Sequence, residues 1–318
     1  MKPFAFVFPG QGSQSVGMLD GWGDHPQVVQ AVAEASDALG EDVGQLIKDG
    51  PKEALALTTN TQPVMLVAGV AAYRVWMAEV GVAPLALAGH SLGEYSALVA
   101  AGVLTLAQAA PLVRFRAQAM QQAVPVGQGA MAAILGMDAE RVKAICAEVT
   151  SAQPAGSAEV VEAVNFNDPA QTVIAGSKAA VEQACVALKA AGAKRALPLP
   201  VSAPFHSSLM KPAALQLKDK LAATVFAAPQ IPVINNIDVL VETDADRLRD
   251  ALYRQAFGPV RWVECVQAIG ARGLNTLVEC GPGKVLAGMT KRIAPELQGL
   301  ALFDPASLAE VKNNILEA

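Results

Sequence analysis

Leu85-Ala86-Leu87-Ala88-Gly89-His90-Ser91-Leu92-Gly93 is the stretch of the chain that decides the fold. Its first four residues are apolar without alternation, which is typical of a strand buried on both faces of a parallel sheet. They lead directly into Gly-His-Ser-Leu-Gly, and a helical segment follows from about residue 92 to residue 101. Strand, sharp turn and helix in this order predict an α/β domain with parallel strands.

The segments on both sides of this stretch extend the α/β pattern. Further strands are expected over 4–8, near 233 and over 276–279, with helices over 26–39 and after residue 206. Thr61-Gln62-Pro63 predicts another helix start, because proline is favoured in a first turn, and its apolar residues continue to about residue 80.

A second pattern occupies residues 126–201. Strands are expected over 130–135, 160–165, 171–175 and 195–201, and helices over 139–149 and 179–191. The order βαββαβ is the ferredoxin-like split motif. We therefore predict a small ferredoxin-like subdomain, 126–201, inserted into a large α/β catalytic domain formed by 1–125 and 202–318.

Composition restricts the class of protein. The 318 residues are 53% apolar and 17% charged, enough for a substantial core. A net charge of −5 argues against a nucleic-acid partner, because no basic field is present to bind phosphates. The apolar runs 4–8 and 64–73 are too short for a signal sequence or a membrane span. We expect a soluble, cytoplasmic protein with no membrane partner.

Metal and disulfide chemistry are not expected. The four cysteines are scattered without a CxxC pair, and the chain has only three histidines. Zinc sites and disulfide frameworks need closer spacing of such residues. We predict no metal site and no cofactor.

The Gly-x-Ser-x-Gly turn predicts a nucleophile at Ser91. Such an elbow has strained backbone angles and close packing that only glycines allow on either side. The helix after it directs N–H groups and a positive dipole end toward the serine. The three-residue pattern is common by itself, and its place between a buried strand and a helix gives it weight.

A serine nucleophile needs a base, and only three histidines are available. His90 is adjacent to Ser91 in the turn, so its side chain is expected to point elsewhere and to be structural. His25 stands in a loop beside a proline, which favours a solvated position. His206 lies in a loop between an extended segment and a helix, and it is the best candidate for the base.

Two further features suit acyl transfer. In Pro9-Gly10-Gln11-Gly12-Ser13, the glycines leave the Gln11 N–H free to face a ligand; with the Leu92 N–H it would form an oxyanion hole. The alternative is a turn without function. Arg114 and Arg116 lie in one helical stretch. Either could be a solvated surface charge, but a guanidinium near the serine would bind a substrate carboxylate.

Taken together, these motifs resemble one family: the malonyl-CoA:acyl carrier protein transacylases of fatty-acid synthesis and the acyltransferase domains of polyketide synthases. The resemblance covers nearly the whole chain, and the motifs follow the family's order. The matching segments are Phe6–Ser13, Asn60–Pro63, Gly89–Glu94, Pro204–His206, Gln255 with Pro259–Trp262, and Gly281–Leu286.

The resemblance implies a set of reacting groups. Ser91 takes the malonyl group from coenzyme A as an ester, with His206 as its base. Gln11 and Leu92 form the oxyanion hole, and the backbone carbonyl of Gln255 orients His206. The family fold combines a hydrolase-like core around a parallel sheet with a ferredoxin-like insert, in agreement with the pattern above.

The resemblance also implies substrate contacts. Arg116 pairs with the malonyl carboxylate, and Asn165 is similar to an asparagine beside the acyl or pantetheine chain. Phe205 resembles the residue of malonyl-selective members. Ala117 stands where the family commonly has glycine, which could narrow the pocket.

The expected activity is therefore ping-pong transfer of malonyl from malonyl-CoA to the thiol of acyl carrier protein. Alternatives are an acyltransferase serving polyketide synthesis, a serine esterase or thioesterase, and an idle scaffold that binds carrier protein. An esterase triad would need an acid, and the nearest in sequence, Glu162 and Asp168, fall in the inserted segment. Candidate docking cations for an acidic carrier protein are Lys189, Lys194, Arg195, Lys291 and Arg292.

Overall fold

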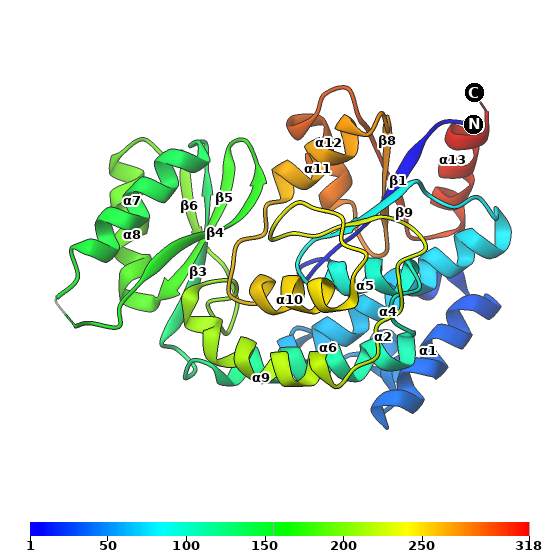
Figure 1. Ribbon diagram of the computed structural model, residues 1–318, viewed down its shortest axis with the longest axis horizontal. Coiled ribbons are helices and arrows are strands. Elements are labelled where there is room, and N and C mark those ends of the chain that lie inside the picture. The colour runs from blue at the N-terminus through cyan, green and yellow to red at the C-terminus, as the bar shows by residue number, and fades with distance from the viewer. Residues whose placement is uncertain (155, 318) are drawn as a thin grey trace.

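A five-stranded parallel sheet forms the centre of the computed structural model, which describes residues 1–154 and 156–317 (Figure 1). The sheet order is β7-β2-β1-β8-β9, and every neighbouring pair is parallel. Its strands are β1 (Phe4–Phe8), β2 (Ala86–Gly89), β7 (Val233–Ile234), β8 (Thr276–Cys280) and β9 (Gln298–Leu302). The predicted α/β class is confirmed, whereas β9 was not predicted.

Helices cover both faces of this sheet. They are α1 (Pro26–Leu39), α2 (Val43–Asp49), α3 (Lys52–Leu55), α4 (Thr58–Glu79), α5 (Gly93–Ala100), α6 (Leu106–Gln122), α9 (Lys211–Ala222), α10 (Ala245–Gln255), α11 (Trp262–Ala271), α12 (Val285–Ile293) and α13 (Pro305–Leu316). Two 3₁₀ turns are η1 (Asp20–Trp22) and η2 (Ser208–Met210).

Alternation along β1 divides the core into two layers. Phe4, Phe6 and Phe8 point into the larger layer with α1, α4 and α6, and Phe6 packs edge-to-face on Trp76 with ring centroids 5.4 Å apart. Ala5 and Val7 point into the other layer, against α11 and α12. Both faces of β1 are therefore buried, as its unbroken apolar run predicts.

The second unit, drawn in green in Figure 1, is built on a four-stranded antiparallel sheet with strand order β4-β5-β3-β6. In chain order, the unit consists of β3 (Gly129–Leu135), α7 (Ala139–Ser151), β4 (Val161–Asp168), β5 (Gln171–Ser177), α8 (Lys178–Ala190) and β6 (Arg195–Pro198). This confirms the ferredoxin-like subdomain. The division into 1–125 with 202–318 and 126–201 stays a proposal about domain boundaries.

Some predicted bounds were wrong. Helix α4 begins at Thr58 rather than at 61, so Pro63 lies in its second turn. Strand β6 ends at Pro198 rather than at 201: the Leu199 N–H still donates to the Met131 carbonyl of β3, but Pro200 has no N–H to continue the ladder. His25 is not simply solvated: its Nδ1 accepts the Gln27 N–H at 3.2 Å and caps α1.

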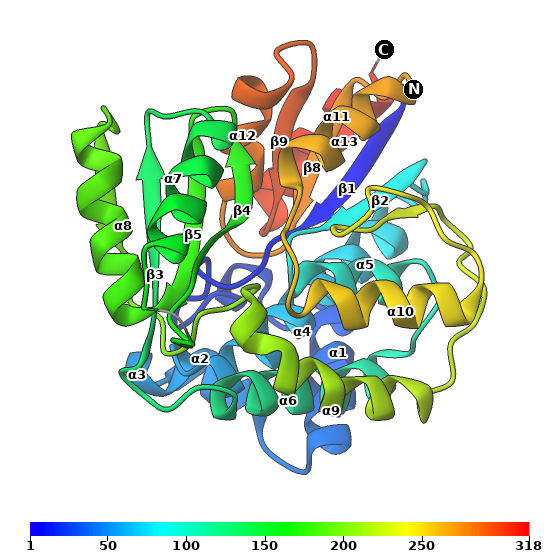
Figure 2. The ribbon, with the colours of Figure 1, turned by 60° about the vertical axis from the view of Figure 1, so that its left-hand side comes forward.

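The small subdomain contacts the core through β4, which faces α11 and α12 (Figure 2). The Phe166 N–H donates to the Val260 carbonyl at 3.0 Å, and the Val260 N–H donates to the Val164 carbonyl at 2.8 Å. Arg292 of α12 pairs with Asp168 at 2.9 Å. These contacts place β4 beside the carboxyl ends of the parallel strands, where ligands bind in open α/β sheets.

Glu279 of β8 provides a test of core electrostatics. Its side chain is fully buried, and one oxygen accepts the Ala287 N–H in the first turn of α12 at 2.9 Å. Burial raises the pKa of Glu279 to about 7, against the opposing effect of the hydrogen bonds from the α12 backbone. The unfolded chain therefore releases this proton near pH 4.5, at lower pH than the folded chain does.

We expect this carboxyl to stabilise the fold fully below about pH 4.5 and to lose that contribution as pH rises to about 7. In Glu279→Gln the side chain cannot ionise. The stability of wild type minus that of the variant should fall between pH 4.5 and 7 and then stay level. Urea denaturation of both proteins at several pH values measures this difference, with Glu310→Gln, an exposed site, as control. A pH-independent difference would contradict the prediction.

Candidate functional site

Ser91 lies in a strained turn between β2 and α5. Its φ is +53°, an uncommon conformation for a residue with a side chain. A Cβ on Gly89 would lie 1.9 Å from the Gly93 carbonyl carbon, and a Cβ on Gly93 would lie 2.1 Å from the Phe8 oxygen. Both glycines are therefore required by the close approach of turn, helix and central strand.

Ser91 and His206 are in contact, although 115 positions separate them. The Ser91 Oγ lies 2.6 Å from His206 Nε2, and His206 Nδ1 lies 2.9 Å from the Gln255 carbonyl. Because a carbonyl can only accept, the Nδ1–H donates to it, and Nε2 is left to accept the serine proton. This is the geometry of a hydroxyl with its base.

The base is held neutral by its surroundings. Burial is the main cause that lowers the pKa of His206 to about 3, and the positive charge of Arg116 lowers it further. The third group of the arrangement is a carbonyl rather than a carboxylate. Glu162 accepts the Ser208 N–H at 2.6 Å and Asp168 pairs with Arg292, so each of the two acids considered for an esterase triad has another partner.

Arg116 reaches the same point from α6. Its guanidinium is buried, with NH1 donating to Gln62 Oε1 at 2.7 Å and NH2 to Gln255 Oε1 at 3.1 Å. NH2 also lies 3.3 Å from the Ser91 Oγ. Burial lowers the pKa of Arg116 from its usual value. Arg114, in contrast, pairs with Glu41 at 2.6 Å.

Within the described residues, the cation beside the serine has no carboxylate in direct contact. Besides the Ser91 Oγ, its acceptors are two neutral amides, each oriented by a second bond: Gln62 Nε2 donates to Gln11 at 3.1 Å, and Gln255 Nε2 donates to Glu94 at 2.9 Å. Each amide therefore turns its oxygen toward Arg116. The charge is held in place and can still bind an external carboxylate.

The two proposed oxyanion donors are free. Within residues 1–154 and 156–317, neither the Gln11 N–H nor the Leu92 N–H donates to another group of the protein. Leu92 immediately precedes α5, and the Gln11 side chain is fixed by a 2.9 Å bond to Thr58. One free N–H follows the serine in the chain and the other belongs to a residue that lines the same cavity. Such donors suit an oxygen that gains negative charge.

A cavity of about 120 Å³ unites these side chains. Asn165 of β4 lines it, and its Oδ1 is buried without a hydrogen-bond partner in the described part of the chain. Phe205, also buried, forms part of the wall next to His206. Thus six of the eight residues singled out from the sequence line one small space: Gln11, Ser91, Arg116, Asn165, Phe205 and His206.

The seventh residue, Gln255, contacts this lining through its bonds to His206 and Arg116. The eighth residue, Leu92, follows Ser91 in the chain and has a buried side chain. The structure therefore brings together all the residues that the sequence singled out, while their roles in a reaction stay proposals.

Sequence reasoning missed four polar residues behind the site. Gln62 and Glu94 lay within quoted motifs without a role, and Asn236 follows a short buried strand. Burial raises the pKa of Glu94 to about 7, although hydrogen bonds from Gln255 and Asn236 and the charge of Arg116 oppose this. The fourth, Asn167, is 2.8 Å from His90 Nε2, which agrees with the structural role expected for His90. Polar residues directly after buried strands were the available signal.

The described residues contain neither a group of metal-ligating side chains nor a membrane-spanning helix. In the described ranges, no three His, Cys, Asp or Glu side chains are grouped so that they could hold a metal ion. Across the same residues, no helix has the length and apolar character to cross a membrane.

Comparisons with known proteins agree with this geometry. Residues 5–300 match the family model described as acyl transferase domain. The malonyl CoA-acyl carrier protein transacylase of Escherichia coli strain K12 is 54% identical over 310 residues, which cover 97% of this chain and 98% of that protein.

Solved structures are equally similar. The acyl-carrier-protein S-malonyltransferase from Burkholderia pseudomallei 1710b is 62% identical with a TM-score of 0.94, over 98% of this chain and 100% of the other. A malonyl-transacylase in complex with its type II PKS acyl-carrier protein is 52% identical with a TM-score of 0.95, at the same coverage. The fold, the family match and the relatives agree, and the chain belongs to the acyl transferase domain family.

Proposed function

We propose that this protein transfers the malonyl group from malonyl-CoA to the phosphopantetheine thiol of acyl carrier protein, in fatty-acid biosynthesis. The observation that carries the proposal is the buried guanidinium of Arg116, 3.3 Å from the oxygen of a serine bound to a histidine. A nucleophile beside a carboxylate-binding cation selects an acyl group that ends in a carboxylate. The names of the relatives support the same substrate and acceptor.

The first half-reaction forms a malonyl ester. The Ser91 Oγ attacks the thioester carbonyl while its proton passes to His206 Nε2. The carbonyl oxygen gains negative charge and accepts the N–H groups of Gln11 and Leu92. The carbon–sulfur bond then breaks, and coenzyme A leaves as a thiol with the proton from His206.

The second half-reaction reverses these steps with another thiol. The carrier-protein thiol gives its proton to His206, and its sulfur attacks the ester carbonyl. The carbon–Oγ bond breaks, and Ser91 recovers the proton from His206. During both steps Arg116 holds the malonyl carboxylate, so the chain's own groups carry out the transfer.

Asn165 and Phe205 contribute to substrate binding in this proposal. The unpartnered Oδ1 of Asn165 supplies an acceptor on the cavity wall, which suits an amide N–H of a pantetheine chain. Phe205 limits the width of the cavity beside His206. Discrimination against one extra methyl group is worth about 1–3 kcal/mol, so slow use of methylmalonyl-CoA is expected.

Polyketide synthesis is the second candidate pathway. The relative solved with a type II PKS acyl-carrier protein favours it, because that structure pairs a similar enzyme with such a partner. The chemistry at Ser91 is the same in both pathways. Comparison of transfer rates to carrier proteins of the two pathways separates them.

The proposed docking surface for the carrier protein is a groove on the small subdomain. This groove, of about 420 Å³, contains Lys178 and Lys189 and shares Met131, Leu199 and Val201 with the catalytic cavity. The groove also contains one carboxylate, Glu182, so its two lysines leave an excess of one positive charge. A groove with this excess that adjoins the cavity suits an acidic carrier protein and its thiol arm.

The other candidate cations are less well placed. Lys194 and Arg195 stand at the start of β6, roughly 13 Å along the strand from Leu199. Arg292 is already paired with Asp168. Among the cations predicted on the small subdomain, Lys189 is therefore the one we propose for docking, and Lys291 of α12 stays an untested alternative.

The malonyl-seryl ester should accumulate when no acceptor thiol is present. Incubation with radiolabelled malonyl-CoA and no acceptor should place one label on the peptide that contains Ser91. Ser91→Ala should take up no label, because no other nucleophile contacts His206 in this geometry. Ser96→Ala, which removes a buried serine of the following helix α5, should label like wild type. A label on a different residue, or none, would remove the central claim.

The role of Arg116 is tested by substrate choice. Arg116→Ala should lower kcat/KM for malonyl-CoA relative to acetyl-CoA, which has no carboxylate. A lost charge-assisted pair costs about 1.5–3 kcal/mol, or roughly 10- to 150-fold in that ratio. Arg114→Ala, in the same helix but paired with Glu41, should leave the ratio unchanged. Equal losses with both substrates in Arg116→Ala would show that the residue is structural.

Carrier-protein docking is tested by charge reversal. Lys189→Glu should raise KM for acyl carrier protein about 3- to 10-fold, because a rim charge then repels the partner. KM for free pantetheine, which needs no docking surface, should change little. Lys194→Glu serves as the matched control on the same subdomain. If both variants raise KM equally, or neither does, the groove is not the docking surface.

A further inference from the structure

The carboxamide of Asn236 spans the nucleophile turn. Its Oδ1 accepts the Ser91 N–H at 2.7 Å, and its Nδ2 donates to the Gly89 carbonyl at 2.7 Å. Both bonds are short, and Asn236 is fully buried. One side chain thus satisfies a donor and an acceptor of the turn backbone that no regular secondary structure would satisfy.

These bonds determine which amide faces the reacting carbonyl. Because the Ser91 N–H is occupied by Asn236, it is directed away from the catalytic cavity. The next N–H, that of Leu92, is left without a protein acceptor in the described residues. The position of Asn236 therefore fixes the direction of two successive peptide groups, one of which is the proposed oxyanion donor.

Asn236 also belongs to a second set of bonds around a buried carboxylate. The Asn236 N–H and Gln255 Nε2 both donate to Glu94 Oε2, each at 2.9 Å. Gln255 Nε2 donates in addition to the Ser91 carbonyl at 3.0 Å. Hence both the N–H and the C=O of Ser91 are held by side chains, and both side chains meet at Glu94.

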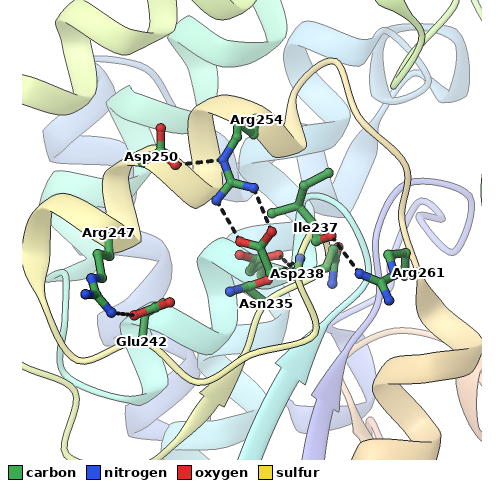
Figure 3. A network of polar contacts seen from close by, with 10 residues as sticks. Asn235, Ile237, Asp238, Glu242, Arg247, Asp250, Arg254 and Arg261 are labelled. Atoms are coloured by element: carbon green, nitrogen blue, oxygen red, sulfur yellow. Dashed lines mark hydrogen bonds and ion pairs between the residues drawn. The ribbon is translucent and has the colours of Figure 1, made fainter.

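The loop that carries Asn236 is itself fixed (Figure 3). Two residues later, Asp238 forms a two-pronged pair with Arg254, at 2.7 and 2.6 Å. Arg254 lies at the end of α10, next to Gln255. The same loop contains Val239 with φ +59°, which is strained for a branched side chain. The loop is therefore held in one conformation at an energetic cost, as at sites that need a defined geometry.

We propose that Asn236 is a positioning residue of the acyl transfer: its carboxamide holds the turn so that the Ser91 oxygen faces His206 and the Leu92 N–H faces the oxyanion. The proposal rests on the function proposed above for Ser91. Asn236 does not line the cavity, and Arg116 is held by Gln62 and Gln255 instead. Loss of the carboxamide should therefore slow the chemical step and leave malonyl binding nearly intact.

The test compares two variants at this position. Asn236→Ala removes both bonds to the turn. Asn236→Asp keeps the side-chain shape and the acceptor for the Ser91 N–H but loses the donor to the Gly89 carbonyl. Because the shape is kept, this variant provides a second measurement if Asn236→Ala does not fold. Both should lower kcat for malonyl transfer about 10- to 100-fold, since small displacements of reacting atoms cost that much. KM for malonyl-CoA should change less than threefold, because Arg116, which binds the malonyl carboxylate in the proposed function, keeps its own contacts.

Asn235→Ala is the matched control. Asn235 is the neighbouring buried residue of the same loop; its Oδ1 accepts the Asp238 N–H at 2.8 Å and makes no bond to the turn. We expect a comparable drop in thermal stability with little change in kcat. If Asn235→Ala lowers kcat as much as Asn236→Ala, or if both Asn236 variants keep wild-type kcat, the positioning role is wrong.

A serine-directed fluorophosphonate probe separates this inference from the proposed function. The probe needs Ser91, His206 and the turn, but no malonyl group or carrier protein. Its rate of reaction with Ser91 should fall in both Asn236 variants by a similar factor to kcat. Normal probe reactivity in these variants would overturn the inference even if malonyl transfer is confirmed. Reduced reactivity in a protein that transfers no malonyl group would support the inference and contradict the function.

Discussion

The positive φ of Ser91 is the constraint on which the rest of the site depends. The turn can form only where Gly89 and Gly93 let it pack against β1, since a Cβ at either position would overlap backbone atoms. It therefore requires β1 and β2 to be paired neighbours at the centre of the sheet. The turn brings the serine to the carboxyl end of the sheet, where His206 and Arg116 arrive from distant segments. The site therefore depends on the fold, because the packing of the core compensates for the backbone strain at Ser91.

Electrostatics gives the site its second constraint. Arg116 is buried beside Ser91, and among the described residues its hydrogen-bond acceptors are neutral: two glutamine amides and the Ser91 Oγ. The buried carboxyl of Glu94 is linked to it through Gln255. Burial of a cation without a direct counter-ion costs free energy. The hydrogen bonds that Arg116 donates offset part of this cost. Its charge also lowers the pKa of His206. In the proposed reaction a malonyl carboxylate neutralises this charge and so strengthens the base when the correct substrate is bound.

Much of this could be predicted from the sequence, for identifiable reasons. The unbroken apolar runs of β1 and β2 and the glycines around Ser91 reflect local physics, so the parallel sheet and the turn followed from them. The scarcity of histidine left His206 as the best partner. By contrast, the position of Asn236 after a short buried strand did not reveal its role, because that role depends on a turn 145 positions away. Strand β9 was missed because it lies at the sheet edge with a half-exposed pattern, and the start of α4 because Pro63 is tolerated in a second turn. Local patterns in one sequence do not reveal which distant residues come into contact.

The orientation of His206 by a carbonyl bears on the choice between a thiol and water as acceptor. A carboxylate partner would stabilise the protonated imidazole, whereas the Gln255 carbonyl raises the pKa of His206 too little to offset burial and the charge of Arg116, which lower it to about 3. Ser91 is helped by contact with His206 at 2.6 Å and by Arg116, which donates to its oxygen. A thiol needs little help, because its pKa of about 8.5 lies roughly seven units below that of water. Water has neither the fixed contacts of the serine nor the acidity of the thiol. In the proposed reaction the same weak base therefore serves both thiol exchanges, whereas attack by water on the ester would need a stronger base.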